Sequence, residues 1–210
     1  MCPLPMGPWL WPELRMAIVM WSVMMVAMML PTAAPMAMLF ARIQRHRRAS
    51  GQAATPVTLF IAGYVLTWTG WSVLAATLQW SFQSMLLMTP QLTLESATLG
   101  GVFLIVAGIY QLTPMKNLCL VHCQSPIGFF VSRWREGWAG ALEMGARHGG
   151  YCIGCCWALM GLLFVVGVMN LAWVAVLSAY VLVEKALPKL AASRLVGLAL
   201  VGWGLWVVMP

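Results

Sequence analysis

The sequence GGYCIGCCWALMGLLFVVGVMNLAWVAVLSAYVLV, residues 149–183, contains no charged side chain along its whole length. A helix of about 20 apolar residues is long enough to cross the hydrocarbon core of a bilayer, so this run is too long for one crossing. The stretch GVMN at 167–170 interrupts it with turn-forming residues. The run therefore predicts two membrane-spanning helices, at about 149–166 and 168–187, joined by a tight turn.

Other parts of the chain have the same character. Stretches long and apolar enough to span a bilayer occur at about 16–40, 56–80, 94–112 and 191–208. Pro31 and Pro35 are expected to kink or end the first stretch, because proline removes a helical hydrogen bond. Together with the hairpin, these stretches predict an all-α fold: a polytopic membrane helical bundle of about six transmembrane helices, forming one integral membrane domain over residues 1–210.

The composition excludes several kinds of function. Hydrophobic residues make up 62% of the 210 residues and charged residues only 8%, against about 45–50% and about 25% in soluble domains. Only five side chains are acidic, all of them glutamate, which argues against hydrolysis by paired carboxylates and against oxygen cages for hard cations. The net charge of +7 is expected to come from the basic loops of a membrane protein. Nucleic acid is therefore not an expected partner.

The basic residues predict how the bundle is oriented. Eleven of the twelve Lys and Arg residues lie in 41–55, 113–148 and 184–194, and only Arg15 lies on the opposite side. Loops rich in Lys and Arg stay in the cytoplasm, so these three segments are expected there, with 113–148 as a long cytoplasmic connector. Both termini are then expected on the non-cytoplasmic side of a bacterial inner membrane.

Cysteine and histidine recur at helical spacing in two places. Cys152, Cys155 and Cys156 follow the i, i+3, i+4 pattern that puts side chains on one face of a helix, and His148 lies one turn earlier. The segment C-x2-H-C at 119–123 repeats the pattern. Thiolate and imidazole are soft ligands that suit Cu(I), Zn(II) or an iron–sulfur centre. The candidate metal ligands are Cys119, His122, Cys123, His148, Cys152, Cys155 and Cys156, which we expect to form one site at the cytoplasmic face.

Other interpretations of these cysteines remain open. Buried cysteine commonly behaves as a small hydrophobic residue. Zinc in a structural clip between the third and fourth spans is a second reading, because structural zinc sites usually have four such ligands. A third is thiol redox chemistry at Cys152 and Cys155, which are spaced as C-x2-C. Cys2 is assigned no role.

Two further features have a functional and a structural interpretation. Met20, Met24 and Met28 repeat every four residues in the first span. They are a candidate relay for Cu(I), and the structural interpretation is adaptable packing between helices. Glu184 and Lys185 lie at the end of the fifth span. They are interpreted either as an ion pair at a helix end or as a functional pair, because ionisable residues at membrane depth are commonly functional.

Several segments resemble a bacterial family of predicted metal-binding integral membrane proteins, a domain of unknown function. They are MMLPTAAPM (28–36), YQLTPMKNLCLVHCQSP (110–126), GARHGGYCIGCCWALM (145–160), MNLAW (169–173) and EKALP (184–188). The C-x-G-C-C-W portion is the most specific of them. The resemblance implies a multi-helix membrane domain with a metal site at the matching cysteines and histidines, and it implies no particular activity.

The sequence thus predicts an integral membrane protein that binds a thiophilic metal at its cytoplasmic face. Copper is favoured over zinc, and the expected role is that of a transporter, membrane chaperone or assembly factor. Enzymatic activity of the thiol-redox kind is the less favoured alternative. The expected partners are the lipid bilayer, the metal ion, and further membrane subunits or a metallochaperone.

Overall fold

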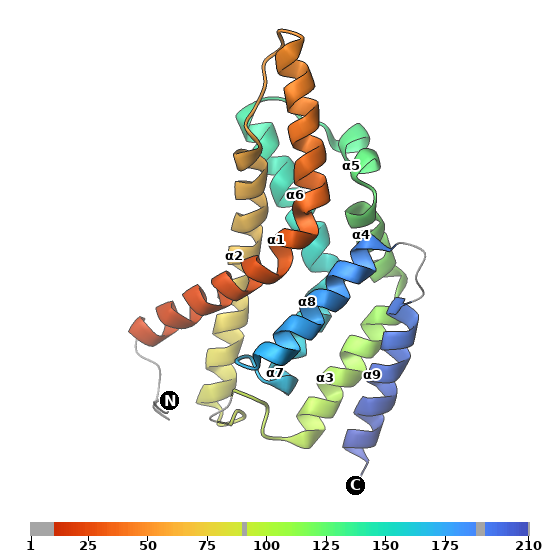
Figure 1. The fold of residues 1–210 in the computed structure, drawn as a ribbon. Coiled ribbons are helices and arrows are strands. Elements are labelled where there is room, and N and C mark those ends of the chain that lie inside the picture. The colour runs from red at the N-terminus through yellow and green to blue at the C-terminus, as the bar shows by residue number, and fades with distance from the viewer. Residues whose placement is uncertain (1–10, 90–91, 188–191, 210) are drawn as a thin grey trace.

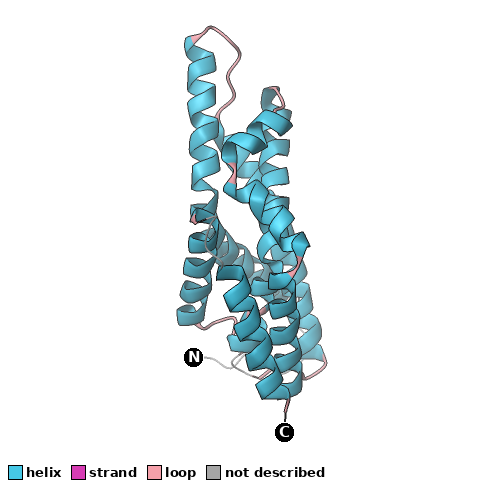
Figure 2. Cartoon of the chain, turned by 90° about the vertical axis from the view of Figure 1, so that its right-hand side faces the viewer, coloured by secondary structure: helices cyan, strands magenta, loops and turns pink. Residues whose placement is uncertain are grey.

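The fold is an elongated bundle of helices (Figures 1 and 2). The computed structural model describes residues 11–89, 92–187 and 192–209, and apart from one bridge between Met88 and Leu94 its regular structure there is helical. The helices are α1 (Trp11–Ala49), α2 (Val57–Ser84), α3 (Ala97–Leu112), α4 (Pro114–Gln124), α5 (Pro126–Arg133), α6 (Gly137–Gly161), α7 (Leu163–Val166), α8 (Leu171–Ala186) and α9 (Ala192–Val208). The all-α class is confirmed for the described residues, and Cys2 lies outside them.

Helix α1 continues through both of its prolines. Figure 1 shows it bending near its middle, as Pro31 and Pro35 predict, but the helix does not end there. The carbonyl oxygen of Met29 accepts hydrogen bonds from the hydroxyls of Thr32 (2.8 Å) and Tyr64 (3.0 Å). Such hydroxyls satisfy backbone groups near a proline kink, which lets an apolar helix keep a proline in its interior.

The apolar helices differ in length from the six predicted spans. Three helical stretches are long and apolar enough to cross a membrane, namely Trp11–Ala49, Val57–Ser84 and Gly137–Val166. Helices α3 and α4 pass the same test together, although they are bent by 64° where they join. Helix α9 is apolar but shorter, and α8 has 16 residues. By length and composition, the described residues therefore hold three candidate spans, or four if the bent pair is one.

Two segments expected to be loops are largely helical. The basic part of 41–55 extends α1 to Ala49, because residues 41–49 contain no glycine or proline and arginine is a good helix former. The predicted connector 113–148 contains α4, α5 and the first half of α6. The predicted turn at 167–170 is present, and Gly167 supplies the positive φ of 97° that it requires.

Glycines allow the closest helix contacts. A Cβ atom at Gly63 of α2 would lie 2.0 Å from the carbonyl oxygen of Leu142, and one at Gly145 of α6 would lie 1.9 Å from that of Phe60. The backbones of α2 and α6 therefore touch, as small residues allow in membrane helix pairs. Helices α3 and α9 meet in the same way through Gly101, Gly108, Gly197 and Gly204.

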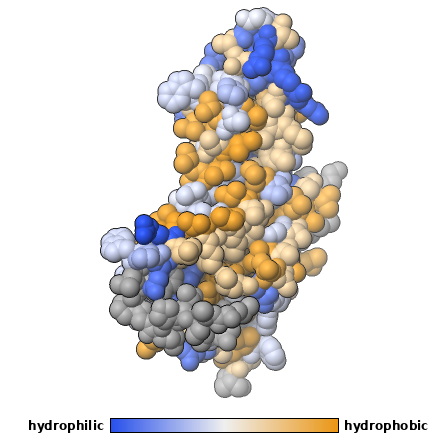
Figure 3. Space-filling model, turned by 60° about the vertical axis from the view of Figure 1, so that its left-hand side comes forward, coloured by the Kyte–Doolittle hydropathy of each residue, from blue (hydrophilic) through white to orange (hydrophobic). Residues whose placement is uncertain are grey.

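One end of the molecule is basic. Arg47 near the end of α1 pairs with Glu136 at 2.8 Å, and Arg135 and Arg147 both pair with Glu143. The pair of Arg47 with Glu136 holds the end of α1 beside the start of α6, and the other two pairs lie within that part of α6 and the residues just before it. In Figure 3 hydrophilic side chains gather at this end, at the top, and an apolar surface covers much of the body.

Candidate metal centre

Three cysteines form a buried row on α6. Cys152, Cys155 and Cys156 are each exposed by 1% or less. The thiols of Cys155 and Cys156 donate to the carbonyl oxygen of Cys152, at 3.1 and 2.9 Å. The helical spacing of the three residues therefore places their sulfurs together inside the bundle.

The bend between α3 and α4 carries a fourth cysteine to this row. Thr113 caps the start of α4, where its hydroxyl accepts from the backbone N–H of Lys116 and Pro114 occupies the first turn. At the other end of α4 the buried Cys123 lies in the same core cluster as Cys152, Cys155 and Cys156 of α6. The four residues Cys123, Cys152, Cys155 and Cys156 are called the thiol cluster below.

Cys119 lies beside the thiol cluster, one turn earlier on α4. Its sulfur is 2.7 Å from the position that a Cβ atom would take at Gly154 of α6. A side chain at Gly154 would therefore require the sulfur of Cys119 to rotate away or α4 to shift. The glycine in C-x-G-C-C thus permits the contact that joins the two cysteine-bearing helices.

The ammonium group of Lys185 reaches the thiol cluster from α8. Its Nζ atom lies 2.8 Å from Cys152 Sγ and donates to Thr32 Oγ1 at 3.2 Å. Tyr64 Oη lies 3.1 Å from the same sulfur. Side chains from α2 and α8 therefore converge on Cys152, and Thr32 of α1 supports the lysine.

The two candidate histidines have different environments. His148 is buried among the rings of Phe60, Tyr64 and Phe129, and its Nδ1 atom has no hydrogen-bond partner. It lies one helical turn from Cys152. His122 lies instead toward the outside, where it stacks on Tyr151 with ring centroids 4.3 Å apart. The structure therefore places His148 next to the thiol cluster and His122 away from it.

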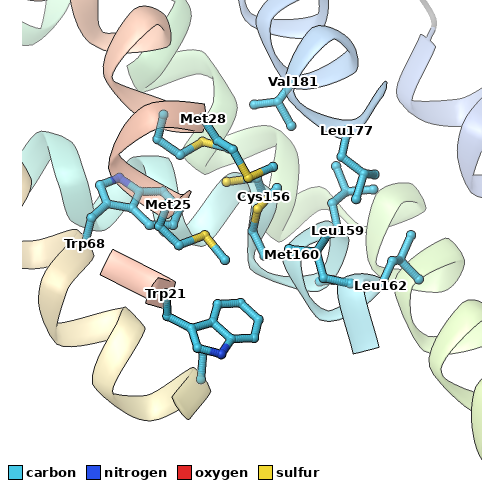
Figure 4. Packing of buried hydrophobic residues seen from close by; sticks show 14 of the residues in the cluster. Trp21, Met25, Met28, Trp68, Cys156, Leu159, Met160, Leu162, Leu177 and Val181 are labelled. Carbon is cyan, nitrogen blue, oxygen red and sulfur yellow. The ribbon is translucent and has the colours of Figure 1, made fainter. Parts of the chain in front are cut away.

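The candidate methionine relay lies along α1. Met20 and Met24 line an apolar groove of about 570 Å³ between α1 and α8. Met28 also lines it, and Figure 4 shows Met25, Met28 and Cys156 in the same buried core. The stripe of thioethers thus runs from the groove to the interior that holds the thiol cluster.

Glu184 and Lys185 do not pair with each other, contrary to the ion pair that the sequence suggests. The Glu184 carboxylate accepts from the ammonium of Lys116 at 2.6 Å, and both side chains are buried. It also accepts from the hydroxyls of Tyr180 and Ser193, at 2.8 and 2.5 Å. Neighbouring residues on α8 thus point to different parts of the bundle, one to an ion pair and the other to sulfur.

The sulfur atoms of Cys152, Cys155 and Cys156 make hydrogen bonds to other groups of the protein. In residues 11–89, 92–187 and 192–209, no three His, Cys, Asp or Glu side chains are arranged to hold a metal ion. The thiol cluster instead bonds to backbone, to Tyr64 and to Lys185. A metal ion would have to replace some of these contacts, which requires side-chain rotation at buried positions.

Sequence reasoning did not identify two residues that touch the site. Thr32 lies between Pro31 and Pro35, and a polar residue at a proline kink in an apolar helix is a sequence signal for such a contact. Tyr64 lies in an apolar stretch with no such mark. Both contacts depend on which helices pack against α6.

A buried cluster of thiols in an all-helical, strongly apolar chain offers the type of ligand that soft metals prefer, which points to a protein that handles such a metal. A family model supports this conclusion and makes it more specific. The family is PpoB2, described as a copper chaperone, and its model matches residues 18–207. The chain belongs to this family, which gives it a copper-related role. No curated protein and no solved structure matches the chain.

Proposed function

We propose that the chain is an integral membrane copper chaperone, which holds Cu(I) as cargo at the thiol cluster and passes it to a partner protein. The observation that carries this proposal is the contact between Cys123 of α4 and Cys155 of α6 inside the bundle. Thiolates favour soft metals, Cu(I) among them, and a buried site excludes water from the bound ion. His148, with its unpartnered Nδ1 atom, is a further ligand.

The surface of the bundle supports insertion into a lipid bilayer. Large apolar side chains that are more than half exposed occur on several helices, including Val19, Leu66, Leu74 and Leu198. An apolar surface of this extent is unusual for a soluble monomer, and lipid is the partner that fits it. In this proposal the shorter helices α8 and α9 complete a bundle of about six spans.

The distribution of charge supports the orientation. The basic end of α1 and the start of α6, joined by Arg47 and Glu136, would face the cytoplasm. Figure 1 has α1 beginning and α9 ending at the opposite end of the bundle. Both termini would then lie outside the cytoplasm, in a bacterial inner membrane. Lys116 and Lys185 are buried inside the bundle, where one pairs with Glu184 and the other contacts Cys152, so neither contributes to this bias.

The methionine stripe gives the proposal a route for the ion. Met20 and Met24 line the groove between α1 and α8, and Met28 continues the stripe inward. Thioethers are soft ligands for Cu(I). Copper would enter from the non-cytoplasmic half of the bilayer and reach the thiol cluster through these residues.

The test is a Cu(I) titration of detergent-purified protein under reducing conditions, against a chromophoric Cu(I) chelator. The unaltered chain is expected to bind Cu(I) stoichiometrically, and Cys123→Ser and Cys155→Ser each to weaken binding strongly. Cys2→Ser is the matched control, because the proposal gives Cys2 no role. Binding of zinc with no binding of Cu(I) would contradict the proposal. A disulfide-linked partner trapped by Cys152→Ser would favour the thiol-redox alternative instead.

A further inference from the structure

Lys185 is the cation in direct contact with the thiol cluster. Its Nζ atom lies 2.8 Å from Cys152 Sγ, and the whole residue is buried. Burying an ammonium group away from water costs several kcal/mol unless an opposite charge or strong hydrogen bonds compensate it. Thr32 Oγ1, at 3.2 Å, is a neutral acceptor and carries no compensating charge.

Within the described residues, the side chains that hydrogen-bond to Lys185 include no carboxylate. From α1 it meets Thr32, and from α6 it meets Cys152. The nearest acidic side chain along the chain, Glu184, is neutralised by Lys116 at 2.6 Å. Among these contacts, the sulfur of Cys152 is the group that can carry a balancing negative charge, as a thiolate.

This arrangement has a consequence for the charge of a metal site. When Cu(I) binds two cysteines, both S–H bonds break, two copper–sulfur bonds form, and two protons leave to solvent without any transfer of electrons. Two thiolates, one Cu(I) and the Lys185 ammonium carry no net charge. The same ligands with a divalent ion carry one positive charge, which is costly inside an apolar bundle.

We propose that Lys185 is a specificity-determining residue, whose fixed positive charge makes the thiol cluster select a monovalent soft cation over a divalent one. The inference rests on the proposed function, because it assumes that copper binds at this cluster. It adds that charge, and not only the softness of sulfur, distinguishes Cu(I) from Zn(II).

Two metal probes test the inference on the unaltered protein. Ag(I) and Cd(II) are both thiophilic but differ in charge. Ag(I) is expected to displace Cu(I) from the purified protein, and Cd(II) at the same free concentration is expected to leave it bound. Displacement by Cd(II) as effective as that by Ag(I) would overturn the inference. If the protein binds no Cu(I) at all, the proposed function itself fails.

A variant tests the role of the lysine directly. Lys185→Met keeps the length of the side chain and removes its charge, whereas Lys185→Arg keeps the charge. The ratio of Cu(I) to Zn(II) affinity, measured by chelator competition, is expected to fall by about tenfold or more in Lys185→Met, the range typical of losing a group that supports a metal site. Lys185→Arg is expected to stay near the original ratio. An unchanged ratio in a Lys185→Met protein that still binds Cu(I) and stays monodisperse would overturn the inference.

Discussion

The sulfur of Cys119 lies 2.7 Å from the place that a Cβ atom would occupy at Gly154. This relationship sets how closely α4 can approach α6. Because Cys123 lies one turn further along α4, the same approach also fixes its contact with Cys155. The glycine between the cysteines of α6 therefore leaves room for Cys119 beside the thiol cluster.

Gly154→Ala is expected to weaken Cu(I) binding and to destabilise the fold by about 1–3 kcal/mol, the usual cost of overpacking. Gly150→Ala is the matched control on the same helix, because a Cβ atom there meets nothing within 4 Å. It is expected to leave binding unchanged and, from helix propensity alone, to stabilise by up to about 1 kcal/mol. Chelator competition and thermal unfolding in detergent measure both effects. Equal behaviour of the two variants would show that close approach at Gly154 does not matter.

The histidines offer a second comparison. His148→Ala is expected to lower Cu(I) affinity by about 10–100-fold, as the loss of a ligand or of its support typically does. His122→Ala is expected to leave the affinity unchanged, because the ring of His122 stacks on Tyr151 rather than facing the thiol cluster. The same chelator competition measures both variants. A larger loss for His122→Ala would mean that the metal lies on the outer side of α4.

The buried ion pair of Lys116 and Glu184 is expected to stabilise the junction of α4 and α8. Lys116→Met leaves a buried carboxylate without its counter-ion, so it should destabilise the protein by about 3–5 kcal/mol. Combining Lys116→Met with Glu184→Gln removes both charges and should recover most of that loss, because the amide oxygen still accepts from Tyr180 and Ser193. Thermal unfolding of the single and double variants gives the coupling. If the double variant is as unstable as the sum of the single variants, the pair is not coupled.

The methionine stripe is expected to affect how fast copper arrives rather than how tightly it is held. Replacing Met20, Met24 and Met28 together by Leu conserves volume and costs little stability, since such swaps usually cost less than about 1.5 kcal/mol each. Stopped-flow loading with Cu(I) should become several-fold slower while the equilibrium affinity stays the same. Met38→Leu, at an exposed position of the same helix, is the control. Unchanged loading kinetics would remove the relay from the proposal.

The orientation is testable in cells. Eleven of the twelve Lys and Arg residues lie in segments predicted to be cytoplasmic, so the C-terminus is expected outside the cytoplasm. A reporter that is active only outside the cytoplasm should therefore be active when it is fused to the C-terminus. The matched fusion within 50–55, between α1 and α2, should give the opposite result. Activity of the C-terminal fusion only in the cytoplasm would reverse the orientation and place the groove of the methionines on the inner side.

The sequence by itself determined the helical class and the pattern of the cysteines. Both follow from local rules: long apolar runs are helical, and the i, i+3, i+4 spacing places three sulfurs on one face. It also indicated the bend at Pro31 and Pro35 and the turn at Gly167, since these residues restrict or free the backbone wherever they occur. The lengths of the helices were less predictable, because basic residues after residue 40 are compatible with both a loop and a helix.

Only the tertiary structure decided which groups meet. His122 and His148 both stand within four residues of a cysteine in the sequence, yet one ring lies on Tyr151 and the other is buried beside the thiol cluster. Glu184 and Lys185 are adjacent, yet one binds Lys116 and the other contacts Cys152. The physical reason is that successive residues on a helix point about 100° apart, so their partners depend on which neighbouring helix packs on each side. That packing follows from glycine contacts and the bend between α3 and α4, which act between residues far apart in the chain.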